Sequence, residues 1–167
     1  MTITRVTRRR VPILRCATAL LALLSWSWVP AQAPSAAPAL AGPTRVEQSD
    51  PSVVYTGVWY TASRSDLSGG SLAESPYPVS SASLTFVGTG VRWIGFKGVW
   101  GGIAQVYMDG VQTATIDTYS PIDQVQAVMY TAIGLVPGPH TITIKVTGTW
   151  NPAGCCSWVA IDAFDVL

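Results

Sequence analysis

The sequence is poor in the residues on which most catalytic and metal centres depend. Among its 167 residues there are one histidine, His140, and three cysteines, and charged residues make up 11% of the chain. A Ser–His–Asp centre needs a histidine held between a nucleophile and a carboxylate, and the sequence has no G-x-S-x-G motif. A zinc site needs clustered histidines or a C-x-x-C pair, and neither occurs. The sequence therefore predicts a protein that is not an enzyme.

Long hydrophobic runs are also missing, yet the N-terminus has the pattern of an export signal. Residues 1–15 hold five arginines and no acid, and residues 16–29 are almost wholly apolar. Two small-residue motifs follow, AQA at 31–33 and ALA at 39–41. An apolar run of this length is too short for a bilayer core of roughly 30 Å, so we expect a cleaved signal and not a membrane anchor.

We expect cleavage after Ala41, which divides the chain into a signal at 1–41, a lead-in at 42–52 and one domain at 53–167. The predicted product is a secreted protein, and the Sec and twin-arginine routes both stay open. Five of the ten basic residues leave with the signal and all nine acids remain, so the net charge changes from +1 to −4. Nucleic acids and anionic membranes attract clustered positive charge, and the sequence therefore excludes both as partners.

Short segments rich in Val, Ile, Thr and aromatic residues recur along the rest of the chain, separated by Gly, Pro, Asp and Ser. In one of them Ile142, Ile144 and Val146 alternate with polar residues, which is the period of a strand with one buried face. No window of about 12 residues has helical periodicity. The pattern predicts an all-β fold, an antiparallel β-sandwich. We expect its strands near 53–60, 82–87, 90–96, 102–109, 111–118, 125–131, 140–147 and 157–166.

Three connecting segments carry predictions of their own. MDGV at 108–111 predicts a tight hairpin, because Asp-Gly readily takes the positive φ values that such a turn needs. PGPH at 137–140 predicts a second turn, with His140 as a surface residue. Residues 61–81 are the least regular part, and a segment of this length is either a functional loop or contains a strand, which we place at 71–75.

Several motifs resemble a known family. RVEQSDPSVVYTGVWYTAS, FVGTGVRWIGFKGVWGGIAQVYMDGV, GLVPGPHTITIKVTGTWNPA and VAIDAFDVL occur in this order. They resemble bacterial extracellular galactose-binding-like modules, a jelly-roll superfold that many carbohydrate-binding modules share. The resemblance covers residues 45–167 and implies a jelly roll and carbohydrate binding. Two loops depart from the family pattern, where this chain adds Trp100, Trp150 and the pair Cys155–Cys156.

Aromatic residues in exposed loops are the main sign of a binding site. Trp100 and Trp150 lie in Gly- and Pro-rich loops, where a large ring indicates recognition unless it covers an end of the core. A sugar ring stacks on such a surface while a few polar side chains bind its hydroxyls. Trp59 and Trp93 fit strands and the core, whereas Trp158 fits either role. The candidate ligand-binding residues are Trp100, Trp150, Asn151, Lys97, Tyr119, Arg92 and Asp123.

A structural calcium ion is a further expectation that the resemblance implies. In jelly-roll sugar modules the first and last strands often pair and share such an ion, and calcium takes oxygen ligands alone. Glu47, Asp50 and Asp162 are the candidate ligands. The alternative is that these carboxylates are surface charges or hydrogen-bond the two ends of the domain to each other.

The adjacent residues Cys155 and Cys156 have no third cysteine to pair with once the signal is removed. In an oxidising compartment they leave three alternatives: a disulfide between neighbours, a disulfide-linked homodimer, or two free thiols. A disulfide between neighbours would stiffen the loop that also carries Trp150 and Asn151, and a stiff loop loses less entropy on binding.

The sequence thus predicts a secreted, non-catalytic carbohydrate-binding module that recognises a polysaccharide or a cell-surface glycan. We expect the contacts in three loops, at 97–101, 119–123 and 149–158. The alternative is a structural or adhesive surface protein, in which the same aromatic residues and cysteines mediate protein contacts or self-association.

Overall fold

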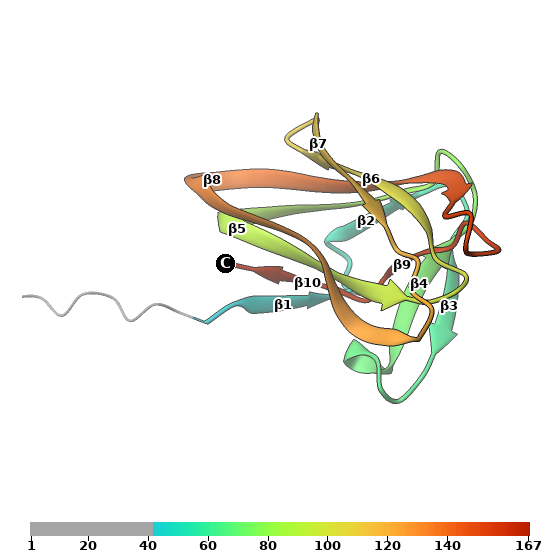
Figure 1. Cartoon of the computed structure of the whole chain (residues 1–167). Helices are drawn as coiled ribbons and strands as arrows, with labels where there is room; N and C mark the ends of the chain where they lie inside the picture. Colours follow the sequence, from blue (N-terminus) through green and yellow to red (C-terminus); the bar gives the residue numbers. More distant parts are fainter. Residues whose placement is uncertain (1–41) are drawn as a thin grey trace, which may run out of the picture. The chain divides into compact units, whose positions relative to one another are not determined.

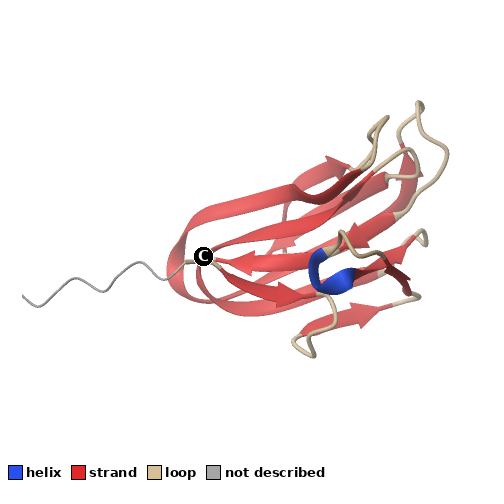
Figure 2. Ribbon diagram, turned by 90° about the horizontal axis from the view of Figure 1, so that it is seen from below, coloured by secondary structure: helices blue, strands red, loops and turns tan. Residues whose placement is uncertain are grey.

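The computed structural model of the chain describes residues 42–167, and the predicted export signal lies outside them. The described part consists of β-strands joined by loops, with one short 3-10 turn, η1 (Ser68–Gly70) (Figures 1 and 2). Within this part no helix combines the length and the apolar character that a membrane crossing requires. The strands are β1 (Thr44–Glu47), β2 (Val53–Thr56), β3 (Tyr60–Ser63), β4 (Ser71–Ser75), β5 (Ser81–Lys97), β6 (Gly102–Met108), β7 (Val111–Asp117), β8 (Gln124–Trp150), β9 (Val159–Ile161) and β10 (Ala163–Val166).

The strands form two sheets whose ladders are antiparallel. The larger sheet has the order β1-β10-β5-β8-β6-β7, and β2 also pairs with β5. The smaller sheet has the order β3-β4-β9. Figure 1 shows β5 and β8 running the length of the domain, with β3 and β4 beside one end of it. This is an antiparallel β-sandwich of the jelly-roll class, which confirms the predicted fold.

The hydrophobic core joins the two sheets. Trp93 of β5 and Phe164 of β10 are completely buried, and β9 adds Val159 and Ile161 to the same cluster. The indole Nε1 of Trp93 donates a hydrogen bond to the carbonyl of Ala160 (3.1 Å), so its one polar atom is satisfied. Burial of each large side chain contributes about 1.5–3 kcal/mol. The prediction that Trp93 belongs to the core is confirmed.

Two strands are longer than predicted. The predicted strands at 82–87 and 90–96 are parts of β5, and those at 125–131 and 140–147 are parts of β8. The turn predicted at 137–140 is wrong, because Gly138 and Pro139 stay opposite Gly88 and Val87 in the β5–β8 ladder. The register shifts just after Gly88, where residues 134–137 of β8 face a single residue of β5. The two strands bend there and continue on the other side of the shift.

The N-terminal boundary also differs from the prediction. The lead-in at 42–52 contains β1, which pairs along its whole length with β10, so the sandwich begins at Thr44. The strand predicted at 53–60 is divided into β2 and β3, since Gly57 has a φ of +84°, which breaks the extended backbone. The strand placed at 71–75 inside the irregular segment is present as β4.

The predicted Asp-Gly hairpin is present between β6 and β7, and His140 fastens it to β8. Asp109 and Gly110 both have positive φ, 49° and 81°. The two ring nitrogens of His140 lie 2.7 Å from the Asp109 carboxylate and 2.7 Å from the carbonyl of Val136. Both partners accept hydrogen bonds, so the doubly protonated ring satisfies both. Both hydrogen bonds raise the pKa of His140 above its ordinary value, and the bond to the Val136 carbonyl contributes more than the bond to Asp109.

This arrangement predicts a pH-dependent contribution to stability. A group whose pKa is raised by folding stabilises the folded state fully below its unfolded pKa, about 6.5 for histidine, and less as the pH rises through the folded value. We expect the difference in unfolding free energy between the wild type and His140→Gln to be largest near pH 5.5 and to shrink towards pH 9. Urea denaturation at several pH values measures it. A difference that stays constant over this range would contradict the assignment.

Candidate functional site

The three loops predicted to carry ligand contacts lie together at one end of the sandwich. Main-chain hydrogen bonds join them: the Ser120 N–H donates to the carbonyl of Gly98 (3.1 Å), and the Trp158 N–H donates to that of Trp100 (3.1 Å). Isolated bridges link the same segments. The backbone therefore fixes the three loops relative to one another before any side chain is considered.

Two glycines make this close approach possible. A Cβ on Gly101 would lie 2.2 Å from the carbonyl oxygen of Thr118, and one on Gly102 would lie 2.4 Å from the carbonyl oxygen of Ser157. Both distances are shorter than atoms tolerate, and both obstacles are backbone. The sequence GG after Trp100 is thus a packing requirement of the loop junction.

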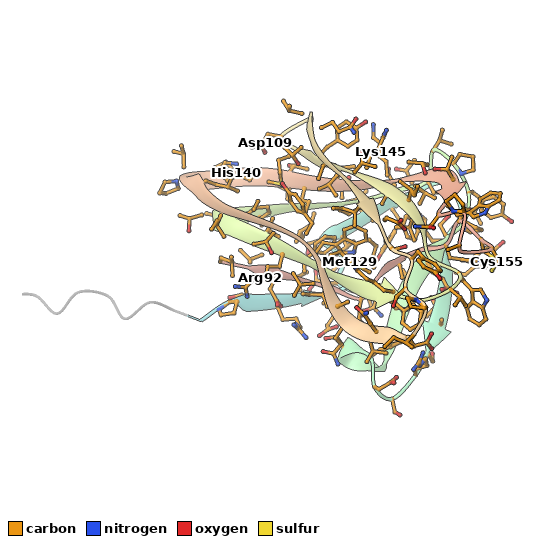
Figure 3. The ribbon with its side chains drawn as sticks, in the orientation of Figure 1. Arg92, Asp109, Met129, His140, Lys145 and Cys155 are labelled. Atoms are coloured by element: carbon orange, nitrogen blue, oxygen red, sulfur yellow. The ribbon has the colours of Figure 1, made fainter. Side chains whose placement is uncertain are left out.

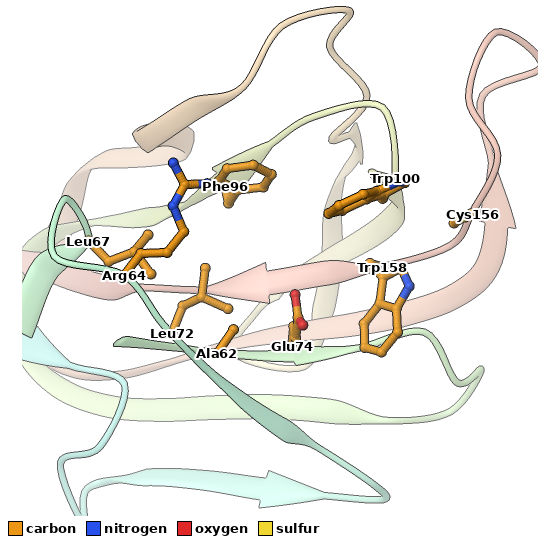
Figure 4. Close-up of a pocket in the computed structure, with 9 residues that line it drawn as sticks. All are labelled: Ala62, Arg64, Leu67, Leu72, Glu74, Phe96, Trp100, Cys156 and Trp158. Carbon is orange, nitrogen blue, oxygen red and sulfur yellow. The ribbon is translucent and has the colours of Figure 1, made fainter. Parts of the chain in front are cut away.

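Beside these loops lies a cleft of about 390 Å³, here called the tryptophan cleft (Figure 4). Its volume falls in the usual range of small-molecule sites, about 300–1,000 Å³. Figure 4 shows the ring of Trp100 above the carboxylate of Glu74, with Trp158 beside it. The lining residues are Ala62, Arg64, Leu67, Leu72, Glu74, Phe96, Trp100, Cys156 and Trp158.

The small sheet supplies the floor of the tryptophan cleft. Side chains alternate between the two faces of a strand, so on β9 Ala160 faces away from the main core that Val159 and Ile161 enter. Ala160 forms a small buried cluster with Leu67 and Leu72 instead. The floor is therefore apolar, and it is held by a strand whose other face belongs to the core.

Two charged side chains border this apolar floor. The Arg64 guanidinium lies 5.4 Å from the centre of the Phe96 ring and pairs with Asp66 (2.9 Å) and Asp123 (3.4 Å). Glu74 is half-buried, and the loss of solvent raises the pKa of its carboxyl above the ordinary value. The cleft thus offers aromatic surface together with one cation and one carboxyl, a combination suited to a ligand with an apolar face and several hydroxyls.

The predicted aromatic residues have different places in the structure. Trp100 lines the tryptophan cleft and is 61% exposed. Trp150 is 49% exposed at the end of β8, opposite Gly102, and is not among the lining residues. Tyr119 is half-buried next to Gly98, and it too lies outside the lining. Of the predicted aromatic contacts, only Trp100 faces the cleft.

The predicted polar residues are also divided. Asn151 organises its own loop, because its Nδ2 donates to Asp117 Oδ2 (2.6 Å) and its Oδ1 accepts from the Ala153 N–H (2.9 Å). Asp123 borders the cleft only through its ion pair with Arg64. Lys97 ends β5 opposite Gln124. Arg92 lies in the middle of the large sheet, far from Cys155 in Figure 3, so the structure does not bring it to the site.

Six of the lining residues were not predicted from the sequence, and one was left undecided. Ala62, Arg64, Leu67, Leu72 and Glu74 come from the irregular segment 61–81, where the only signal was its unusual length, and Phe96 comes from β5. Trp158, which fitted either role, lines the cleft. Its ring packs edge-to-face against Tyr60 at a centroid distance of 5.9 Å.

Cys155 and Cys156 lie at the border of this site. Both are free thiols, with Cys155 exposed and Cys156 half-buried, and their Sγ atoms are 2.7 Å apart. Cys156 belongs to the cleft lining. The pair therefore borders the tryptophan cleft through Cys156, in the loop that also carries Trp150 and Asn151.

Two of the predicted metal ligands meet in the interior. Glu47 Oε2 and Asp162 Oδ1 are buried without a hydrogen-bond partner, while Ser68 binds the other oxygen of each carboxylate through its Oγ (2.8 Å) and its N–H (3.2 Å). Burial raises the pKa of Asp162 to about 6, and the nearby Glu47 adds to the rise. Asp50 is exposed, and its Oδ1 accepts two hydrogen bonds from Ser52, so it lies apart from this pair.

These two carboxylates fit a calcium ion in one respect. Two unpaired anionic oxygens close to each other repel, and a cation would relieve that repulsion. Residues 42–167 contain no group of three or more His, Cys, Asp or Glu side chains that could hold a metal, so remaining ligands would have to be backbone, hydroxyl or amide oxygens or water.

A second cleft of about 380 Å³ opens between the turn after β1, strand β2 and the small sheet. Its walls include Tyr55, Trp59, Tyr60 and Thr61. Trp59 was predicted to lie in a strand, but it belongs to the connection between β2 and β3. It is half-buried against the main core, and its indole Nε1 donates to the carbonyl of Thr56 (3.0 Å).

Part of the chain is similar to short segments of two much longer proteins. No protein-family model matches it. It is 37% identical over 99 residues to the A type blood N-acetyl-alpha-D-galactosamine deacetylase of Flavonifractor plautii, and 29% identical over 103 residues to the A type blood alpha-D-galactosamine galactosaminidase of the same organism. These matches cover 59% and 62% of this chain, but the chain spans only 13% and 10% of the two relatives.

Solved structures agree on the fold. A two-domain esterase active on acetylated mannans superposes with a TM-score of 0.58 at 17% identity, over 81% of this chain and 40% of the esterase chain. A Paenibacillus cycloisomaltooligosaccharide glucanotransferase superposes with a TM-score of 0.55 at 16% identity, over 74% and 18% of the two chains. The chain has the jelly-roll fold of carbohydrate-binding-module-like domains, which confirms the predicted resemblance at the level of the fold.

Proposed function

We propose that this protein is a secreted, non-catalytic carbohydrate-binding module whose ligand occupies the tryptophan cleft. The observation that carries the proposal is the pair Trp100 and Trp158 at one apolar cleft bordered by Arg64 and Glu74. A sugar ring would lie against the indoles while the guanidinium and the carboxyl bind its hydroxyls. The names of the two curated relatives suggest glycans with a terminal galactosamine-type sugar as the first ligands to test.

The composition of the cleft supports a binding role over catalysis. Glycoside hydrolysis uses two carboxyl groups facing each other across the bond, whereas Glu74 is the one acid that lines the tryptophan cleft. His140 is occupied in the β6–β7 hairpin. The chain corresponds to a small part of each enzyme that it resembles, as expected for an accessory module.

Replacing Trp100 with alanine tests the site. The change removes an exposed ring, so we expect the melting temperature to stay nearly unchanged. Retention on beads carrying the type A trisaccharide, or on galactan or acetylated mannan, should weaken by about tenfold or more, because the ring face that the sugar covers is lost. Affinity electrophoresis and isothermal titration calorimetry measure the change.

Trp150→Ala is the matched control, since it removes another exposed tryptophan from the same end of the domain. It should retain wild-type binding. Loss of binding in Trp150→Ala with full binding in Trp100→Ala would reject the tryptophan cleft. Absence of binding by the folded wild type on every glycan would reject carbohydrate recognition and favour the adhesive alternative.

We also propose a structural calcium ion held by Glu47 and Asp162. Calcium would supply positive charge to two buried carboxylate oxygens that have no other partner. Since β1 ends at Glu47 and β10 follows Asp162, the ion would hold the first and last strands together. Its role would be stability and not chemistry.

Thermal unfolding with calcium and with a chelator tests this proposal. A ligand that binds only the folded state stabilises it by about 2.7 kcal/mol at 100 times its dissociation constant. We expect calcium to raise the melting temperature of the wild type and of Asp50→Asn, the control, but not that of Glu47→Gln. An equal shift in all three proteins, or none in the wild type, would contradict the site.

A further inference from the structure

The adjacent thiols of Cys155 and Cys156 are in contact with each other and with the tryptophan cleft. Their Sγ atoms lie 2.7 Å apart, and Cys156 lines the cleft. Cys155 is exposed, so a small reagent reaches it from solvent. In Figure 4 Cys156 lies on the same side of the cleft as Trp100 and Trp158.

The cysteines are also coupled to the loop that carries Trp100. The carbonyl of Val99 accepts a hydrogen bond from the Cys155 N–H (3.3 Å) and a weak one from its thiol (3.7 Å). Val99 directly precedes Trp100. On the other side of the pair, the Trp158 N–H donates to the Trp100 carbonyl (3.1 Å). The two sulfur atoms are therefore connected to the backbone of both cleft tryptophans through a few bonds.

We propose that Cys155 and Cys156 are a redox modification site, and that a disulfide between them increases the affinity of the tryptophan cleft for its glycan. The inference rests on the proposed function, because it concerns the regulation of the same cleft. The redox inference also goes beyond the proposed function. It predicts that the affinity changes while both tryptophans and the residues that would bind the sugar stay the same.

The step uses a low-molecular-weight disulfide, such as oxidised glutathione, as the oxidant. The thiolate of Cys155 attacks one sulfur of the oxidant and releases its other half as a thiolate. The sulfur of Cys156, after losing its proton, attacks Cys155 Sγ in the mixed disulfide and releases the second half. One S–S bond forms in the protein and one breaks in the oxidant, and two electrons and two protons pass to two reduced thiols. A thiol reductant reverses the step.

Pairing within the chain is favoured over a disulfide-linked homodimer. Each thiol already touches its neighbour, whereas a thiol of a second chain must first diffuse to it. The half-buried position of Cys156 further restricts access by another protein.

Oxidation has two physical consequences for the cleft. The Cys155 sulfur no longer carries a hydrogen, so its weak bond to the Val99 carbonyl is lost while the N–H bond remains. The ring between neighbouring residues restricts the backbone at 155–156, and this loop then loses less conformational entropy when a sugar binds. If one or two fewer side chains have to be ordered when the sugar binds, the affinity rises by about 2- to 10-fold.

The test compares the purified protein after treatment with oxidised glutathione and after treatment with a thiol reductant. We expect oxidation to lower the mass by about 2 Da without forming a dimer on a non-reducing gel. The amide hydrogens of Cys155 and Trp158 should exchange more slowly in the oxidised protein. On beads carrying the type A trisaccharide, and on galactan, the oxidised protein should bind about 2- to 10-fold more tightly. The double variant Cys155→Ser/Cys156→Ser should respond to neither treatment.

Each outcome distinguishes the two proposals. Equal binding in both redox states, tighter binding after reduction, or a disulfide-linked dimer would overturn the redox proposal and leave the carbohydrate site intact. The same redox response in the double serine variant would also overturn it. Absence of glycan binding in both states would contradict the proposed function, and unchanged amide exchange would then overturn the coupling as well.

Discussion

The site depends on the main-chain hydrogen bonds that join three loops around Gly101 and Gly102. These bonds hold Trp100 at a fixed position relative to Trp158, and each contributes about 0.5–1.5 kcal/mol net when both partners are buried. The glycines allow the backbones to approach more closely than any other residue would permit. A rigid junction of this kind is what a binding site requires, because preformed loops lose little entropy when the ligand arrives.

The small sheet connects this junction to the stability of the domain. Its strand β9 has one face in the main core, through Val159 and Ile161. On the other face Ala160 packs with Leu67 and Leu72, which line the tryptophan cleft. The floor of the cleft is therefore backed by a strand of the core, while the loops form the walls. Functional groups on a rigid sheet keep their geometry better than groups on loops alone. The proposed calcium ion at Glu47 and Asp162 would add stability at a separate place, where β1 ends and β10 begins.

The fold could be predicted from the sequence because alternation and turn residues act locally. Ile142, Ile144 and Val146 reveal a half-buried strand whatever it pairs with, and Asp109–Gly110 encodes its hairpin. The continuity of β5 and β8 could not be predicted, since a proline such as Pro139 usually ends a strand. Here β8 continues past it through an irregularity in β8 itself, where residues 134–137 face one residue of β5. Strand β1 could not be predicted either, because it forms by pairing with β10, which lies far away in the sequence.

The site was predictable only in part, for a related reason. The argument from an exposed tryptophan among glycines selected Trp100 and Trp150 alike, and only the tertiary structure shows that Trp100 lines the cleft and Trp150 does not. Arg64 and Glu74 reach the cleft through the pairing of β3 with β4, which leaves no mark in a single sequence. Arg92 was a candidate because its side chain could bind sugar hydroxyls, yet it lies in the large sheet opposite Asp165 and Thr131, away from the loops.

The central claim is that a sugar lies between Trp100 and Trp158. The most direct test follows the five indole N–H signals of residues 42–167 by NMR while the type A trisaccharide or a galactan oligosaccharide is added. The account predicts that the signals of Trp100 and Trp158 shift with one common saturation curve, while those of Trp93 and Trp150 do not move. Shifts confined to Trp150, or to Trp59 in the second cleft, would contradict it.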